Sequence, residues 1–171
     1  MDIYFHSSGI GSQNTELRPE IELATLRTNG EGFVRMVTAA FGYFRNRGGG
    51  HIAVISSIAG TRGLGAAPTY SATKRMQNTY IDALEQLSRM EGCGIRFTDI
   101  RPGFVATALL SPKDHYPMLM RPEKVAKRIM QLLKKPRRRV VIDRRYAVLV
   151  FLWRLVPAGV WARLRIRTRN K

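Results

Sequence analysis

The sequence has a single cysteine, few acidic residues and no long uninterrupted apolar run. Cys93 by itself forms neither an intrachain disulfide nor a cysteine-cluster metal site, which fits a reducing cytoplasm. The three histidines, His6, His51 and His115, show no metal-ligand spacing, so no metal is expected. No G-x-S-x-G motif is present, which argues against a serine hydrolase. The start shows no signal-peptide pattern, and we expect a cytoplasmic location.

Acidic side chains are scarcest in the last third of the chain. Residues 121–171 hold 17 Lys and Arg but only two acidic residues, Glu123 and Asp143. Residues 1–120 hold 12 basic and 10 acidic residues, so the formal net charge of +17 is gathered near one end. The excess charge is therefore a local feature and not a property of the fold.

The composition is otherwise that of a globular protein, with 44% hydrophobic residues in a chain of one-domain size. Apolar and β-branched runs predict four buried strands, at residues 2–6, 51–56, 95–100 and 139–143. Helical patterns lie between them, at residues 19–47, 70–90 and 122–133, and the first stops at three glycines. This alternation predicts an α/β fold, a three-layer, doubly wound parallel sheet of the Rossmann-like kind.

The chain closes with a segment that is both basic and apolar. Its apolar run, residues 147–162, contains Arg154 and Pro157 and is shorter than the about 20 residues of a bilayer span. Two interpretations stay open: a terminal helix packed on its own domain or on a partner subunit, or an interfacial helix at a lipid surface. No nucleic acid is expected, because the arginines alternate with aliphatic residues. We divide the chain into a main domain, residues 1–143, and a basic amphipathic appendage, residues 144–171.

Three residues suggest proton chemistry. Tyr70 and Lys74 are four residues apart at the start of a helical pattern, so they share one face. An ammonium beside a phenol favours the phenolate, and we expect Lys74 to lower the pKa of Tyr70. Ser57 follows the strand at residues 51–56, at a sheet edge where α/β proteins bind ligands. Each feature alone is also compatible with an exposed helix pair or a simple turn.

The order of these motifs resembles the short-chain dehydrogenase/reductase family. Asn29 in "TNGEGF", Ser57, Tyr70 and Lys74 are similar to its catalytic tetrad, and "RPGFVAT" at residues 101–107 resembles its Pro-Gly turn. The resemblance covers about residues 1–145. It implies an oxidoreductase that moves hydride between NAD or NADP and a small alcohol or ketone.

The resemblance also implies a role for each residue of the tetrad. Tyr70 would exchange a proton with the substrate oxygen, and Lys74 would lower the pKa of Tyr70 and hold the nicotinamide ribose. Ser57 would polarise the substrate oxygen, and Asn29 would help to hold a water in the proton path. The implied cofactor-binding residues are Ser7, Ser8, Gly9, Tyr70, Lys74, Pro102, Gly103, Val105 and Thr107.

The stretch "HSSGIG" indicates which part of the family fold is present. The family has two glycine turns, and Asn29 lies only 20 residues after Gly9, with the next strand leading straight to Ser57. Ser7, Ser8 and Gly9 therefore resemble the second turn, and we expect an N-terminally truncated fold without the pyrophosphate turn. Strand 2–6 would then form a bare edge, and cofactor binding would be weak. NAD and NADP are not distinguished, and an inactive fragment is the alternative.

Partners are expected from the same resemblance. The substrate loop, residues 108–121, is rich in apolar side chains that favour an apolar substrate or a lid packed on itself: Leu109, Leu110, Tyr116, Met118 and Met120. A homo-oligomer is expected through helices 19–47 and 70–90. Five residues of the second helix would line that face or contact the sheet: Ala72, Met76, Tyr80, Ala83 and Leu87. A membrane-surface module built on the C-terminal segment is the alternative function.

Overall fold

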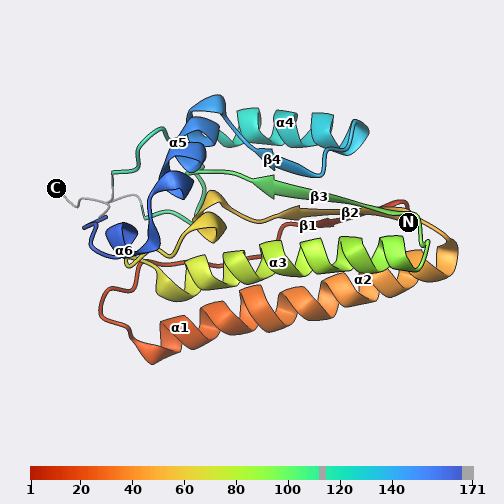
Figure 1. Cartoon of the computed structure of the whole chain (residues 1–171), viewed down its shortest axis with the longest axis horizontal. Helices are drawn as coiled ribbons and strands as arrows, with labels where there is room; N and C mark the ends of the chain where they lie inside the picture. Colours follow the sequence, from red (N-terminus) through yellow and green to blue (C-terminus); the bar gives the residue numbers. More distant parts are fainter. Residues whose placement is uncertain (112–114, 167–171) are drawn as a thin grey trace.

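A computed structural model describes residues 1–111 and 115–166 and contains one parallel sheet (Figure 1). Its strands are β1 (Ile3–His6), β2 (Gly50–Ile55), β3 (Ile95–Arg101) and β4 (Arg139–Val141), in the order β1-β2-β3-β4. Every neighbouring pair is parallel. The predicted α/β sheet is confirmed. β4 ends two residues early because the Asp143 carboxylate accepts a hydrogen bond from the Arg145 amide and so caps the next helix.

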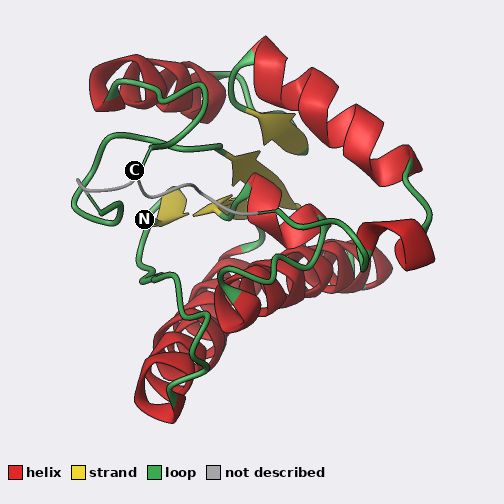
Figure 2. Cartoon of the chain, turned by 90° about the vertical axis from the view of Figure 1, so that its left-hand side faces the viewer, coloured by secondary structure: helices red, strands yellow, loops and turns green. Residues whose placement is uncertain are grey.

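Helices cover both faces of the sheet, which confirms the three layers (Figure 2). One face carries α1 (Pro19–Leu26), α2 (Phe33–Arg47) and α3 (Pro68–Met90). The opposite face carries α4 (Pro122–Lys134) and α5 (Arg144–Leu155). Proline stands in the first turn of α1, α3 and α4, where its missing N–H and fixed φ are compatible with a helix.

The helix predicted at residues 19–47 contains a turn that the sequence pattern does not reveal. Between α1 and α2, Arg27–Gly32 forms a π-helical turn that carries Asn29. Such turns are frequent at functional sites. α2 ends where predicted, because Gly48 takes a left-handed conformation with φ of 77°.

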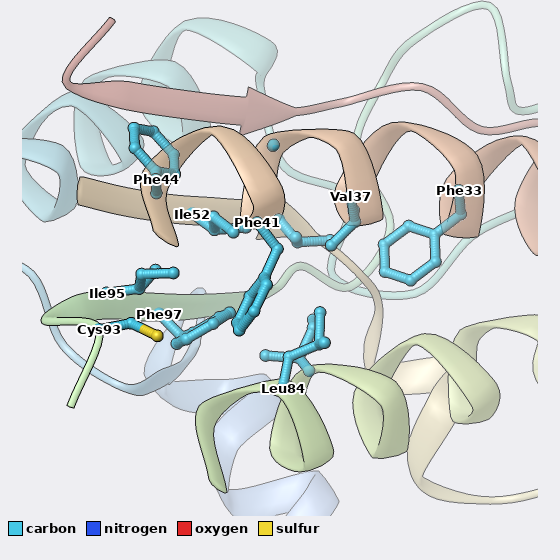
Figure 3. Packing of buried hydrophobic residues seen from close by; sticks show 12 residues of the cluster. Phe33, Val37, Phe41, Phe44, Ile52, Leu84, Cys93, Ile95 and Phe97 are labelled. Carbon is cyan, nitrogen blue, oxygen red and sulfur yellow. The ribbon is translucent and has the colours of Figure 1, made fainter. Parts of the chain in front are cut away.

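The larger core cluster lies between α2, α3 and the sheet (Figure 3). Phe33, Val37, Phe41 and Phe44 repeat at helical spacing along α2 and are buried against the strands and α3. Each such side chain stabilises the fold by roughly 1.5–3 kcal/mol.

The helix face expected to pair subunits is partly used by this core. Met76, Tyr80 and Leu87 of α3 are half-buried against the cluster, whereas Ala72 and Ala83 are exposed. Oligomerisation through α2 and α3 stays a prediction.

β1 forms one edge of the described sheet, as expected. Its ladder is with β2, and its Ile3 and Phe5 side chains are 40% and 37% exposed. An apolar strand with an open hydrogen-bonding edge favours pairing with another strand.

The C-terminal segment packs on the domain as far as Trp161, whose indole N–H donates to the Gly63 carbonyl oxygen at 2.8 Å. Tyr146 and Val150 of α5 are buried in the second core cluster with α4. Pro157 separates α5 from the short α6 (Ala158–Trp161). In the described part of the chain, no helix has the length and apolar character to cross a membrane. Residues 112–114 of the expected substrate loop and residues 167–171 of the expected appendage lie outside the described residues, and the division at residue 143 stays a prediction.

Hydrogen bonds join this segment to the 3₁₀ turn Ile58–Thr61, which follows Ser57. The Arg62 guanidinium donates to the carbonyl oxygens of Trp153, Arg154 and Val156, at the negative end of α5. The Trp153 indole N–H donates to Thr61 Oγ1 at 2.9 Å. These bonds therefore hold the end of α5 against the turn that follows Ser57.

Gly60 lets this 3₁₀ turn approach α3 closely. A Cβ at Gly60 would lie 2.6 Å from the Lys74 carbonyl oxygen. We expect Gly60→Ala to lower the free energy of unfolding by about 1–3 kcal/mol, because backbone must move to admit the methyl group. Urea denaturation measures this loss. Gly63→Ala is the control, since its Cβ would have no neighbour within 4 Å. Equal midpoints for the two variants would contradict the close approach.

Candidate active site

The carboxyl ends of β1, β2 and β3 meet at one edge of the sheet and carry the predicted site loops. Ser7, Ser8 and Gly9 follow β1 and are exposed. Ser57 follows β2, and Pro102 follows β3. The Pro102 carbonyl oxygen accepts the Ile58 N–H at 3.1 Å, which joins the second and third loops. This edge is the usual ligand side of a parallel α/β sheet.

Ser57 and Tyr70 are brought into contact. Ser57 caps the 3₁₀ turn by accepting the Ala59 N–H at 3.1 Å, and its hydroxyl lies near enough to the Tyr70 phenol to lower the pKa of that group. Tyr70 stands in the first turn of α3 and is half-buried. The loop after β1 lies directly on its ring, because a Cβ at Gly11 would come within 2.5 Å of Tyr70 Cδ2. Two hydroxyl groups therefore lie close together at the carboxyl edge of the sheet.

Lys74 lies one helical turn beyond Tyr70 and is 4% exposed. Its ammonium donates to the Ile55 carbonyl oxygen at 3.3 Å and to Gln77 Oε1 at 3.1 Å. The Lys74 Nζ atom is 5.8 Å from the centre of the Tyr70 ring. The shared face expected from the spacing of four residues is confirmed.

The expected lowering of the Tyr70 pKa is wrong, because the net shift is upward. Burial raises the pKa of Tyr70 above its ordinary value of 10.0, and the nearby Ser57 hydroxyl opposes this only in part. Burial also lowers the pKa of Lys74 from 10.5 to about 8, while the negative charge of Asp99 acts in the other direction. The physical reason is that burial outweighs the effects that favour the charged form, while the Lys74 ammonium donates to Ile55 and Gln77.

Asn29 is fully buried in the π-helical turn and fastens the loop after β1. Its amide exchanges two hydrogen bonds with the Ile10 backbone, accepting the N–H at 2.8 Å and donating to the carbonyl at 2.6 Å. A Cβ at Gly9 would lie 3.4 Å from both Asn29 Oδ1 and Lys74 Nζ. The structure thus gathers Asn29, Gly9 and Lys74.

The remaining predicted cofactor residues follow β3. Gly103 lies under the ring of Tyr146, where a Cβ would come within 2.3 Å of Cζ. Val105 bridges to Met120, and Thr107 is exposed with its N–H donated to the Val105 carbonyl at 2.8 Å. These residues line the loop next to Ser57 rather than the Asn29–Lys74 cluster.

Sequence reasoning missed two buried polar residues. Gln77 is fully buried and contacts Lys74, a position that the spacing of three residues on one helix face could have revealed. Asp99 is buried in β3, where it accepts hydrogen bonds from Ser56 and, at 2.7 Å, from Arg101 Nε. The signal for Asp99 was a pair of charges inside an apolar strand, "TDIR".

Fold and site together define a doubly wound α/β protein with a hydroxyl–ammonium cluster at the carboxyl edge of its sheet. The family model described as "short chain dehydrogenase" matches residues 1–116. The chain therefore belongs to the short-chain dehydrogenase family, which confirms the resemblance seen in its motifs.

Individual relatives agree with this assignment. A sepiapterin reductase of Chlorobaculum tepidum is 28% identical over 145 residues, covering 82% of this chain and 59% of the relative. A 3-ketoacyl-ACP reductase structure from Sinorhizobium meliloti is 28% identical, with a TM-score of 0.66 over 83% of this chain and 67% of that chain.

A short chain dehydrogenase of Burkholderia cenocepacia, solved in complex with NADP, shares the fold at 16% identity. Its TM-score is 0.82 over 98% of this chain and 70% of that chain. The present chain spans about half the length of the curated relatives it matches.

The lowered pKa of Lys74 makes stability depend on pH. Between about pH 8 and about pH 10 the unfolded chain holds the Lys74 proton more firmly than the folded chain, so raising the pH favours folding. Relative to Lys74→Met, the wild type should gain up to about 1.4 kcal/mol per pH unit across this window. Urea titrations at several pH values measure the difference. Lys127→Met, an exposed control, should follow the wild type, and parallel curves for all three would contradict the buried ammonium.

Proposed function

We propose that this chain carries the catalytic side of an NAD(P)-dependent oxidoreductase that reduces a carbonyl group to an alcohol. The observation that carries this proposal is the buried Lys74 ammonium, 5.8 Å from the centre of the Tyr70 ring, with the Ser57 hydroxyl on the neighbouring loop. Two hydroxyl groups at one point can both contact a substrate oxygen, and one of them can supply a proton.

The direction of proton transfer follows from burial. Because the pKa of Tyr70 lies above its ordinary value, the phenol is protonated at neutral pH. Tyr70 is therefore a proton donor, as a carbonyl reduction requires. Ser57 orients the substrate oxygen by a second hydrogen bond. Lys74, positively charged below about pH 8, favours the tyrosinate that remains after the proton has left.

The residues around Gly9 fit a nicotinamide nucleotide. Ser7 and Ser8 offer exposed hydroxyl groups, and the lack of a side chain at Gly9 leaves room beside Asn29 and Lys74. When bound, the nicotinamide supplies or accepts the hydride. Ser7, Ser8, Gly9 and Lys74 would hold it, with Pro102, Gly103, Val105 and Thr107 at the neighbouring loop. The NADP complex of the Burkholderia relative makes NADPH the first cofactor to test and NADH the second.

The substrate is proposed to be a small apolar ketone or aldehyde. Leu109 is 43% exposed, and Leu110 is half-buried on the same loop. Met118 and Met120 instead pack against the second core cluster, so only part of the loop is free to contact a substrate. A homo-oligomer through α2 and α3 belongs to the same proposal.

Tyr70→Phe tests the proposed chemistry. Loss of the proton donor should lower NADPH-dependent reduction of a ketone by about 10²–10⁴-fold, because general acid catalysis contributes that much. The rate of NADPH oxidation is measured by absorbance, and cofactor affinity by fluorescence titration should not change. Tyr43→Phe, an exposed tyrosine of α2, is the control. Equal rates for the two variants would refute the role of Tyr70, and wild-type chain without any cofactor binding would favour the inactive-fragment alternative.

Attachment to an anionic membrane surface is a second candidate function. Val148, Phe151, Leu152 and Leu155 form an exposed apolar stripe on α5, with Phe151 65% exposed. Arginines lie near this stripe in the sequence: Arg144, Arg145, Arg154, Arg163 and Arg165. An apolar stripe bordered by arginines is typical of helices that lie in a lipid interface. A cytoplasmic enzyme of this kind would act at the membrane face.

Vesicle sedimentation tests this second function. The full chain should pellet with vesicles that contain phosphatidylserine, and less so at high salt, because screening weakens the arginine contribution. Phe151→Ser together with Leu155→Ser should abolish pelleting. Met36→Ser, which removes an apolar side chain of α2 that is 52% exposed, should leave pelleting unchanged. Unchanged pelleting of the double variant would exclude the α5 stripe as the lipid contact.

A further inference from the structure

Gln77 is a polar side chain that the proposed chemistry does not use, although it is fully buried. It lies one turn beyond Lys74 on α3, on the face that contacts the π-helical turn. Burying a side-chain amide costs free energy unless both its oxygen and its nitrogen form hydrogen bonds. Here both ends are satisfied, and each partner belongs to the candidate site.

The Gln77 amide connects two site residues. Its Oε1 atom accepts a hydrogen bond from the Lys74 ammonium at 3.1 Å, and its Nε2 atom donates to the Asn29 carbonyl oxygen at 2.8 Å. The orientation of the amide is thereby fixed, because only the oxygen can accept from an ammonium and only the nitrogen can donate to a carbonyl. The Asn29 carbonyl that accepts this bond belongs to the π-helical turn, so Gln77 ties that turn to α3.

We propose that Gln77 is a positioning residue that holds the Lys74 ammonium between the end of β2 and the π-helical turn. This inference rests on the proposed function, which gives Lys74 a place beside the reacting hydroxyl groups. Without Gln77, the ammonium keeps a single backbone acceptor, the Ile55 carbonyl oxygen at 3.3 Å. The lysine would then be free to change rotamer, and the tie between α3 and Asn29 would be lost.

The pKa of Lys74 depends on its hydrogen bond with Gln77. Three titratable groups act on Lys74 from the elements packed around it: Tyr70 of α3, His6 of β1 and Asp99 of β3. The Gln77 oxygen adds a neutral acceptor that stabilises the ammonium form. Replacing that acceptor by an apolar group should therefore lower the pKa of Lys74, and replacing it by an anionic group should raise that pKa.

The test is a ¹⁵N NMR titration of the Lys74 amine in the full chain, with its signal assigned by its loss in Lys74→Met. Gln77→Met removes the acceptor at similar volume and should lower the pKa of Lys74 by about one unit. Gln77→Glu places a carboxylate at the same position and should raise the pKa by about 1–3 units. Gln86→Glu, the same change at an exposed position of α3, is the matched control and should leave it unchanged.

Opposite shifts of the two Gln77 variants support the positioning role, since a merely structural residue would not produce them. An unchanged Lys74 titration in Gln77→Met would overturn it. If Gln77→Glu does not fold, as judged by circular dichroism, Gln77→Met alone decides the question by its direction. The titration requires no turnover, so a chain that fails to oxidise NADPH refutes the proposed function without affecting this result.

Discussion

The burial of the Lys74 ammonium is the constraint on which the candidate site depends. A charge that is almost fully removed from water needs several acceptors, and the structure supplies them from β2 and from α3 itself. The hydrogen bond from Lys74 to the Ile55 carbonyl oxygen fixes the start of α3 against the sheet. This contact in turn places Tyr70 beside Ser57. The π-helical turn completes the arrangement, because it brings the Asn29 carbonyl to the amide that holds the lysine.

This arrangement separates two effects that are easily confused. The nearby ammonium favours a charged tyrosine, while burial favours the neutral phenol, and burial is the stronger effect on Tyr70. A protonated phenol is what the proposed role of Tyr70 as a proton donor requires. The C-terminal helix α5 also supports the site, because the Arg62 and Trp153 hydrogen bonds connect α5 to the turn that follows Ser57.

Much of this could be predicted from the sequence, for identifiable reasons. Runs such as "HIAVIS" are too short and too apolar for anything but a buried strand, and the spacing of Tyr70 and Lys74 fixes their common face. The π-helical turn could not be predicted, because "RTNGEG" carries no period of its own. The raised pKa of Tyr70 was also beyond reach, because it depends on long-range burial, including the loop around Gly11 that packs on the ring. Gln77 resembled any polar helix residue until its two partners were known.

The central claim is that the Ser57–Tyr70–Lys74 cluster supports hydride transfer to a carbonyl carbon. The most direct measurement uses NADPH deuterated at the transferable position of the nicotinamide, with the alcohol product analysed by mass spectrometry. We predict deuterium on the carbinol carbon of the product with the wild-type chain, and about 10²–10⁴-fold less of this labelled product per unit time with Tyr70→Phe. Product without deuterium on that carbon, or equal rates of labelled product from both chains, would contradict the proposal.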